Sequence, residues 1–213
     1  MRRRSALGVV VAAVVAGTLA LLAGAGCGED FSLDEVPLTE GLELVRPEGW
    51  LVVLHPHAGY ELVRTGPGRV RRANVLVFPR TTIAATAGTD DPAADAFAGA
   101  VEQAFRERIR AAIDRRRGLR APLQDYFAAY AERDCRSLED RGRTWHACML
   151  RRTEAGHPAW YNLHTVTDSA VVLVTAFAAR DDGGEAELSD AALHALLAPV
   201  RPASAPRATG PSS

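Results

Sequence analysis

The histidines and cysteines are the residues of this chain whose chemistry goes beyond packing and charge. The histidines are His55, His57, His146, His157, His164 and His194. His55 and His57 flank a proline, so in an extended segment both imidazoles lie on the same side and could share a metal ion with a third ligand. No carboxylate or cysteine accompanies this pair in the sequence, and a solvated turn beside Gly59 explains it as well. We expect no metal and no other cofactor.

The serines do not show the pattern of a nucleophile. A serine hydrolase brings Ser, His and an acid together, usually with the serine on a sharp Gly-x-Ser-x-Gly turn. Neither Ser137 nor Ser169 has such neighbours. Residues 181–185 (Asp-Asp-Gly-Gly-Glu) offer oxygen ligands but lack the alternating spacing of a calcium loop. We therefore expect no catalytic residues and a protein that is not an enzyme.

The N-terminus carries an export signal. Three arginines at residues 2–4 precede an apolar run at 6–25, and small residues then lead to Cys27. This arrangement resembles a bacterial lipoprotein signal, with Gly24 where that family usually has leucine. The resemblance implies cleavage after Gly26, a diacylglyceryl group on the Cys27 sulfur and a protein held to a membrane by its first residue.

Two alternatives to lipidation stay open. One is an ordinary signal peptide cut near Ala23 or Ala25, and the other is an uncleaved anchor helix, which the length of the apolar run permits. All three place the remaining chain outside the cytoplasm, in the cell envelope. Among lipoproteins, an Asp after the lipidated cysteine resembles an inner-membrane retention signal. Gly28 stands there, which favours the outer membrane if the host has one.

Cys135 and Cys148 lie beyond the export signal, where two thiols are expected to form a disulfide. Residues 140–143 (Asp-Arg-Gly-Arg) between them are typical of a turn in which Gly142 takes positive φ. If antiparallel strands flank this turn, the disulfide joins the two strands of a hairpin. A metal site or a catalytic thiol at Cys148 is the alternative, but Cys148 and nearby His146 supply only two ligands where a zinc site needs three or four.

The charge balance excludes a nucleic-acid partner. The formal net charge is −1, and loss of residues 1–26 removes three arginines and no acids, so the processed chain carries −1 − 3 = −4. Nucleic-acid binding needs a clustered positive field. The processed chain has no such excess.

Residue patterns predict an order of strands and helices. Alternating or continuous apolar runs predict strands at 42–46, 50–54, 60–64, 69–79, 145–151, 160–166 and 170–178. Phe97, Val101, Phe105, Ile109 and Ile113 recur every four residues and predict a helix that begins near Asp90 or Asp91 and ends near residue 117. Weaker helical spacing predicts a short helix at 122–133, and a closing helix is predicted at 188–200. The class is α+β, an antiparallel sheet covered by helices.

The order of elements resembles the PsbP-like α/β/α sandwich. The resemblance rests on residues 45–50 (Val-Arg-Pro-Glu-Gly-Trp), the 160–163 hairpin entering the strand at 171–177, and the last helix ending at 196–201. Mycobacterial LpqN-type lipoproteins are similar in layout. We expect a signal peptide at 1–26, the lipidated cysteine and a spacer at 27–41, one domain at 42–201 and a disordered tail at 202–213.

The resemblance implies binding or assembly and no shared reaction. The sequence therefore favours a non-enzymatic lipoprotein, anchored to a membrane through Cys27, that binds an envelope protein or a small apolar ligand. Two other functions stay open. One is an immunity-type lipoprotein that caps a toxin enzyme, and the other is a weak metal-dependent hydrolase that uses His55 and His57.

Overall fold

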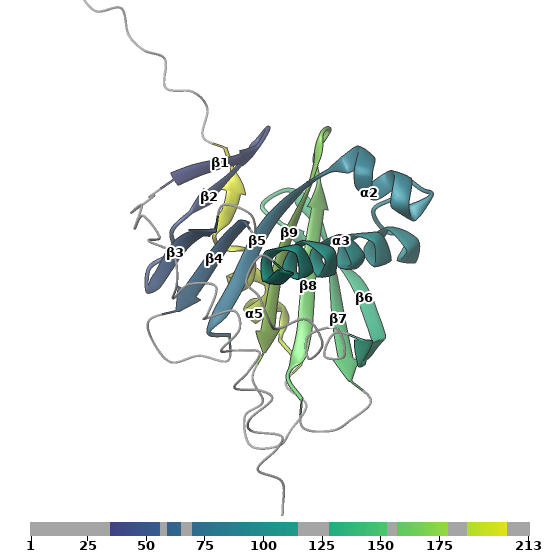
Figure 1. Ribbon diagram of the computed structural model, residues 1–213. Helices are drawn as coiled ribbons and strands as arrows, with labels where there is room; N and C mark the ends of the chain where they lie inside the picture. The colour runs from purple at the N-terminus through teal and green to yellow at the C-terminus, as the bar shows by residue number, and fades with distance from the viewer. Residues whose placement is uncertain are drawn as a thin grey trace, which may run out of the picture.

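The computed structural model describes residues 35–55, 59–64, 70–114, 128–152, 157–178 and 187–203. At its centre is an antiparallel sheet of seven strands in the order β3-β4-β5-β9-β8-β7-β6 (Figure 1). These strands are β3 (Trp50–His55), β4 (Gly59–Arg64), β5 (Arg72–Pro79), β6 (Tyr130–Asp140), β7 (Arg143–Arg152), β8 (Ala159–Val166) and β9 (Ala170–Ala178). The strands predicted at 50–54, 60–64, 69–79, 145–151, 160–166 and 170–178 are confirmed to within a few residues.

Helices lie on both faces of this sheet. The helices α2 (Arg80–Ala87) and α3 (Asp95–Asp114) pack on one face, and α5 (Asp190–Leu197) packs on the other (Figure 1). The predicted α+β class, with an antiparallel sheet between helices, is thereby confirmed. No helix in the described ranges combines the length and the apolar character needed to cross a membrane.

The apolar stripe predicted for the long helix faces the sheet. Phe97, Val101, Phe105 and Ile109 are all buried and pack with Leu173 of the central strand β9. Burial of each such side chain stabilises the fold by about 1.5–3 kcal/mol, which is why the four-residue spacing predicted this helix well.

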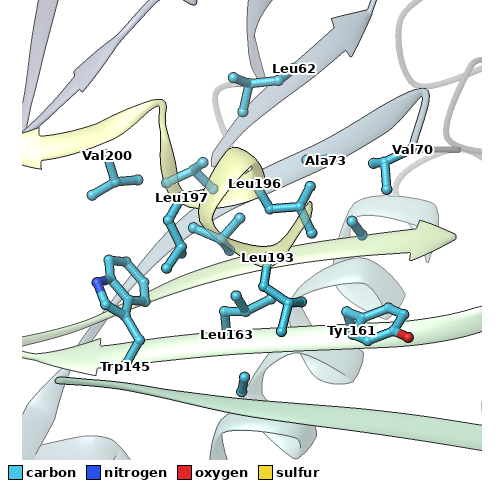
Figure 2. Close-up of a cluster of buried hydrophobic side chains, with 14 of the residues drawn as sticks. Leu62, Val70, Ala73, Trp145, Tyr161, Leu163, Leu193, Leu196, Leu197 and Val200 are labelled. Atoms are coloured by element: carbon cyan, nitrogen blue, oxygen red, sulfur yellow. The ribbon is translucent and has the colours of Figure 1, made fainter. Parts of the chain in front are cut away.

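The helix α5 covers a second hydrophobic core, on the face of the sheet opposite to α3 (Figure 2). Leu193, Leu196 and Leu197 of α5 are buried against Trp145 of β7 and Leu163 of β8. The Ser189 hydroxyl accepts a hydrogen bond from the Ala192 amide at 3.3 Å and so caps the first turn. The predicted helix at 188–200 is too long, because Pro199 has no N–H to continue the helix and the chain becomes extended at Val200.

The hairpin of β6 and β7 bears out the expected disulfide. Asp140 pairs with Arg143, and the two residues between them, Arg141 and Gly142, have φ of 50° and 73°. Two positive φ angles in a two-residue loop are the mark of a type I′ turn, whose twist suits a hairpin. Cys135 lies directly opposite Cys148, with 4.1 Å between their Cα atoms, and the two sulfurs are bonded.

A second sheet changes the predicted boundaries. It has the order β1-β2-β10, with β1 (Glu35–Thr39), β2 (Leu42–Val45) and β10 (Val200–Pro202). β1 lies within the segment 27–41 that the sequence assigned to a spacer, so regular structure begins before residue 42. Val36 and Leu38 of β1 pack against the hydrophobic core, because pairing with β2 holds β1 beside that core. Pro202, assigned to the tail, likewise belongs to β10.

One predicted helix needs correction, and one helix was not predicted. The predicted helix at 122–133 is contradicted at its end, because β6 begins at Tyr130, and its first residues lie outside the described ranges. Tyr130 is buried in edge contacts with Trp160 and Phe177, and pairing with β7 outweighs a weak helical spacing. The sequence also missed α2, whose threonines are poor helix formers.

Candidate binding surfaces

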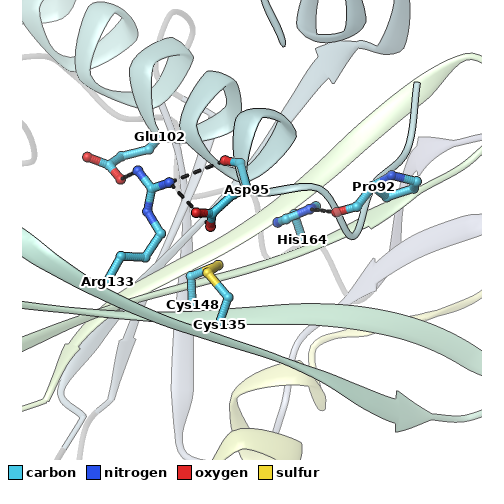
Figure 3. Close-up of polar contacts among 7 residues, drawn as sticks. All are labelled: Pro92, Asp95, Glu102, Arg133, Cys135, Cys148 and His164. Carbon is cyan, nitrogen blue, oxygen red and sulfur yellow. Dashed lines mark hydrogen bonds and ion pairs between the residues drawn. A yellow bond between two sulfur atoms is a disulfide. The ribbon is translucent and has the colours of Figure 1, made fainter. Parts of the chain in front are cut away.

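His164 joins the sheet to the loop between α2 and α3. Its side chain is 1% exposed, and its Nε2 lies 3.1 Å from the Pro92 carbonyl, so this nitrogen carries the proton and donates (Figure 3). Burial lowers the pKa of His164 to about 4, although the Pro92 carbonyl acts in the opposite direction. The ring stacks on Phe97 at 5.7 Å and on His146 at 5.2 Å. His164 is therefore a neutral structural residue.

His146 is more accessible and lies beside a serine. Burial lowers the pKa of His146, while the Asp91 and Glu139 carboxylates act to raise it. Its Nδ1 is 3.5 Å from the Ser137 hydroxyl, which is directly opposite it on β6. A catalytic triad also needs an acid hydrogen-bonded to the imidazole, and none is found for His146 among the described residues.

His55 has a carboxylate partner that the sequence did not reveal. Its Nε2 lies 3.0 Å from Glu61, which is 1% exposed, and Arg72 contacts the other Glu61 oxygen at 3.2 Å. His57 lies outside the described residues. Within those residues, no group of three histidines, cysteines or acids is arranged to hold a metal ion. In the sequence, the alternation of residues 60–64 places Glu61 on the same face of the strand as Val63. It does not show that Glu61 contacts His55 and Arg72.

A second buried carboxylate joins α3 to β6. Glu102 forms ion pairs with Arg106 on its own helix and with Arg133 of β6, the latter at 2.7 Å (Figure 3). The Arg133 guanidinium also reaches the Asp95 carbonyl at 3.3 Å. Glu102 and Arg106 are four residues apart on one helix, whereas the partner Arg133 lies in a segment that the sequence predicted to be helical. This cluster fixes the helix on the sheet.

Polar side chains surround an open cleft of about 390 Å³ at one end of the sheet. Its lining includes Glu40, Arg80, Pro92, Arg143, Thr167 and Asp168. These residues come from the β1–β2 turn, the start of α2, the α2–α3 loop, the start of β7 and the β8–β9 turn. The sequence predicted none of them as a binding residue, because the lining comes from five separate segments of the chain.

The two edges of the seven-stranded sheet differ in character. β3, at one edge, has the sequence Trp-Leu-Val-Val-Leu-His and contains no acidic or basic residue other than His55. Leu51 is 53% exposed, the only exposed large apolar side chain in the described ranges. β6, at the other edge, carries six charged residues, Glu132, Arg133, Asp134, Arg136, Glu139 and Asp140. Charged side chains on an edge strand discourage pairing with another chain, whereas an uncharged edge permits it.

The comparisons with known proteins give a structural likeness but no match by sequence. No protein-family model matches the chain, and no curated protein matches it by sequence. The solution structure of cyanobacterial PsbP (CyanoP) from Synechocystis sp. PCC 6803 is similar, with a TM-score of 0.42 and 11% sequence identity. The match covers 85% of this chain and 99% of that one.

Proposed function

We propose that this protein is a non-enzymatic envelope lipoprotein that pairs, through the exposed edge of β3, with an extended segment of another envelope protein. The observation that carries the proposal is the contrast between the uncharged edge at β3 and the charged edge at β6. Strand addition to a sheet edge gives affinity through main-chain hydrogen bonds and specificity through alternate side chains.

The tether supports a partner in the envelope. The sequence before the domain has the form of a lipoprotein signal ending at Cys27, and the first strand begins at Glu35. Eight Cα steps (35 − 27) span at most about 29 Å. A lipid on Cys27 therefore keeps β1 close to the membrane surface, and the partner must reach that layer.

The side chains of β3 define what the partner segment must offer. Leu51 pairs with Val63 of β4, so both point to the face of the sheet that carries α3. Val52 pairs with Leu62 and packs toward the opposite core. A segment added beside β3 meets apolar side chains on both faces, so the best partner is an uncharged strand with Val, Ile, Leu or aromatic residues. The polar cleft does not favour the alternative of a small apolar ligand.

Site-specific photocrosslinking tests the edge. A photoreactive residue replaces Leu51 in the full-length chain, expressed in cells with an intact envelope, and a matched chain carries it at the exposed Ser137 on β6. We expect a discrete adduct with another envelope protein from position 51 and none from position 137. Equal adducts from both positions, or none from 51, overturn the proposal. An adduct of two copies of this chain also overturns it and assigns the edge to a homodimer.

A pair of lysine variants supplies the functional control. Leu51→Lys places a charge on the open edge, and Ser137→Lys adds the same charge to β6. Because both positions are exposed, both variants are expected to unfold at the same temperature as the wild type. The partner identified by crosslinking should be retained by Ser137→Lys and lost by Leu51→Lys in a binding assay with the purified proteins. Retention by both contradicts docking at β3.

A further inference from the structure

The polar cleft is held in shape by contacts between segments that are far apart in the sequence. The Arg80 amide donates to the Ser169 carbonyl at 3.0 Å, and the Arg80 guanidinium reaches the Thr167 carbonyl at 3.4 Å. Arg143 reaches the Gly41 carbonyl at 3.5 Å. On the remaining side, the Pro92 carbonyl is bound by buried His164. These hydrogen bonds join the segments that line the cleft to neighbouring segments. Because the cleft is held in shape before a ligand arrives, the entropic cost of binding is lower.

Both arginines of the cleft keep donors for a ligand. Each guanidinium has five N–H donors, and the contact of Arg143 in the described residues is the single long hydrogen bond to Gly41. Within the described ranges, the Arg80 guanidinium adds to its carbonyl contact only an ion pair of 3.8 Å with Asp90, a residue that is largely exposed. A planar fork of donors of this kind matches a carboxylate.

The cleft also presents two carboxylates. Glu40 and Asp168 line it, both are exposed, and neither forms an ion pair with Arg80 or Arg143 among the described residues. The lining charges therefore sum to zero, two positive and two negative. A purely anionic ligand meets repulsion from the two carboxylates, and a purely cationic ligand meets repulsion from the two guanidiniums. A ligand that carries both charges satisfies both sets.

From this arrangement we propose that the cleft binds a small zwitterion of the amino-acid or short-peptide class. The ligand carboxylate lies against Arg80 and Arg143, and its ammonium group lies against Glu40 and Asp168. A volume of about 390 Å³ falls within the roughly 300–1,000 Å³ usual for small-molecule sites. The site is separate from the β3 edge, so it stands or falls independently of the protein partner proposed above.

Calorimetric titration with capped peptides tests the charge requirement. The probes are the dipeptide Ala-Ala, its N-acetyl form, which lacks the ammonium group, and its C-terminal amide, which lacks the carboxylate. We expect Ala-Ala to bind and each capped form to bind at least tenfold more weakly. Absence of heat and of any thermal stabilisation with 10 mM Ala-Ala overturns the proposal. Equal affinity for the capped forms overturns it as well, because it would reduce the site to nonspecific contact.

Charge-neutralising variants separate the two ends of the ligand. Asp168→Asn should weaken Ala-Ala and the C-terminal amide but leave the N-acetyl form unchanged. Arg143→Gln should weaken Ala-Ala and the N-acetyl form but leave the amide unchanged. Arg136→Gln, an exposed arginine on β6 outside the cleft, is the matched control and should bind all three probes as the wild type does. Thermal unfolding of each variant checks folding, and loss of binding by Arg136→Gln contradicts the assignment.

Discussion

Single buried polar residues set how this protein responds to acid. His164 is nearly inaccessible, and burial is the main reason that its pKa falls from 6.5 to about 4. In the unfolded chain the imidazole takes up a proton as the pH drops below 6.5, whereas in the folded protein it stays neutral until about pH 4. The unfolded state therefore binds more protons in this window, and the folded state loses stability as the pH falls.

We predict that His164 makes the protein acid-labile. Its stabilisation is fully present above pH 6.5 and is lost as the pH falls toward 4, and that pKa difference corresponds to about 3 kcal/mol of unfolding free energy. Urea unfolding at pH 7 and pH 4.5 measures it. His164→Gln, which keeps a donor for the Pro92 carbonyl, should lose most of the pH dependence. His157→Gln is the control, and an unchanged profile in His164→Gln contradicts the assignment.

At the scale of secondary structure, the β6–β7 hairpin depends on its crosslink. β6 is an edge strand with most side chains exposed, so few apolar contacts hold it to the sheet. The disulfide between Cys135 and Cys148 joins it to β7, whose side of the bond is buried. Closing a loop of this size restricts the unfolded chain more than the folded one.

Reduction of this disulfide should destabilise the domain by about 3 kcal/mol, given a sequence separation of 13 residues. The measurement is the urea midpoint with and without a reducing agent. A chain carrying both Cys135→Ser and Cys148→Ser should start at the lower midpoint and show no response to the reductant. If reduction leaves the wild-type midpoint in place, the hairpin does not depend on the bond.

Elements with strong apolar patterns were predictable from the sequence, and those with weak patterns were not. Phe97 and Phe105 recur with the period of a helix, and β9 is apolar along almost its whole length. The sequence therefore predicted both α3 and β9. β6 has charged residues at most positions and no alternation, because both of its faces are exposed. Only its pairing with β7 makes it a strand, and that pairing is not visible in the local sequence.

At the scale of the whole molecule, strand register creates features that no segment contains. One row of directly paired residues crosses the face of the sheet that carries α3, namely Val53, Glu61, Asn74, Thr175, Asn162, Cys148 and Cys135. Asn162 in this row is 4% exposed, and neither of its amide atoms has a hydrogen-bond partner among the residues that the structure describes. The polar row depends on the alignment of the seven strands, and the cleft depends on the meeting of five separate segments, so the sequence predicted the disulfide but neither of these features.

We predict that the tether decides where the protein is found. Cys27→Ser removes the acceptor sulfur for a lipid and should move the protein from the membrane fraction to the soluble extracytoplasmic fraction. Detergent-phase partitioning of cell fractions measures this, and mass spectrometry of the mature N-terminus identifies the modified residue. Gly28→Ala is the control and should stay with the membrane. A Cys27→Ser chain that remains in the detergent phase contradicts lipid anchoring.

The arrangement of the small sheet has a mechanical consequence. β1 pairs only with β2, while β10 pairs with the other side of β2. A pulling force applied at the N-terminal end of β1 acts first on the pair Glu35 and Val45. The remaining pairs between β1 and β2 then separate one after another. β2 and β10 stay paired, and release of the five residues of β1 adds about 17 Å of extended chain. Under a pulling force, β1 can therefore detach and extend before the hydrogen bonds of the seven-stranded sheet are stretched.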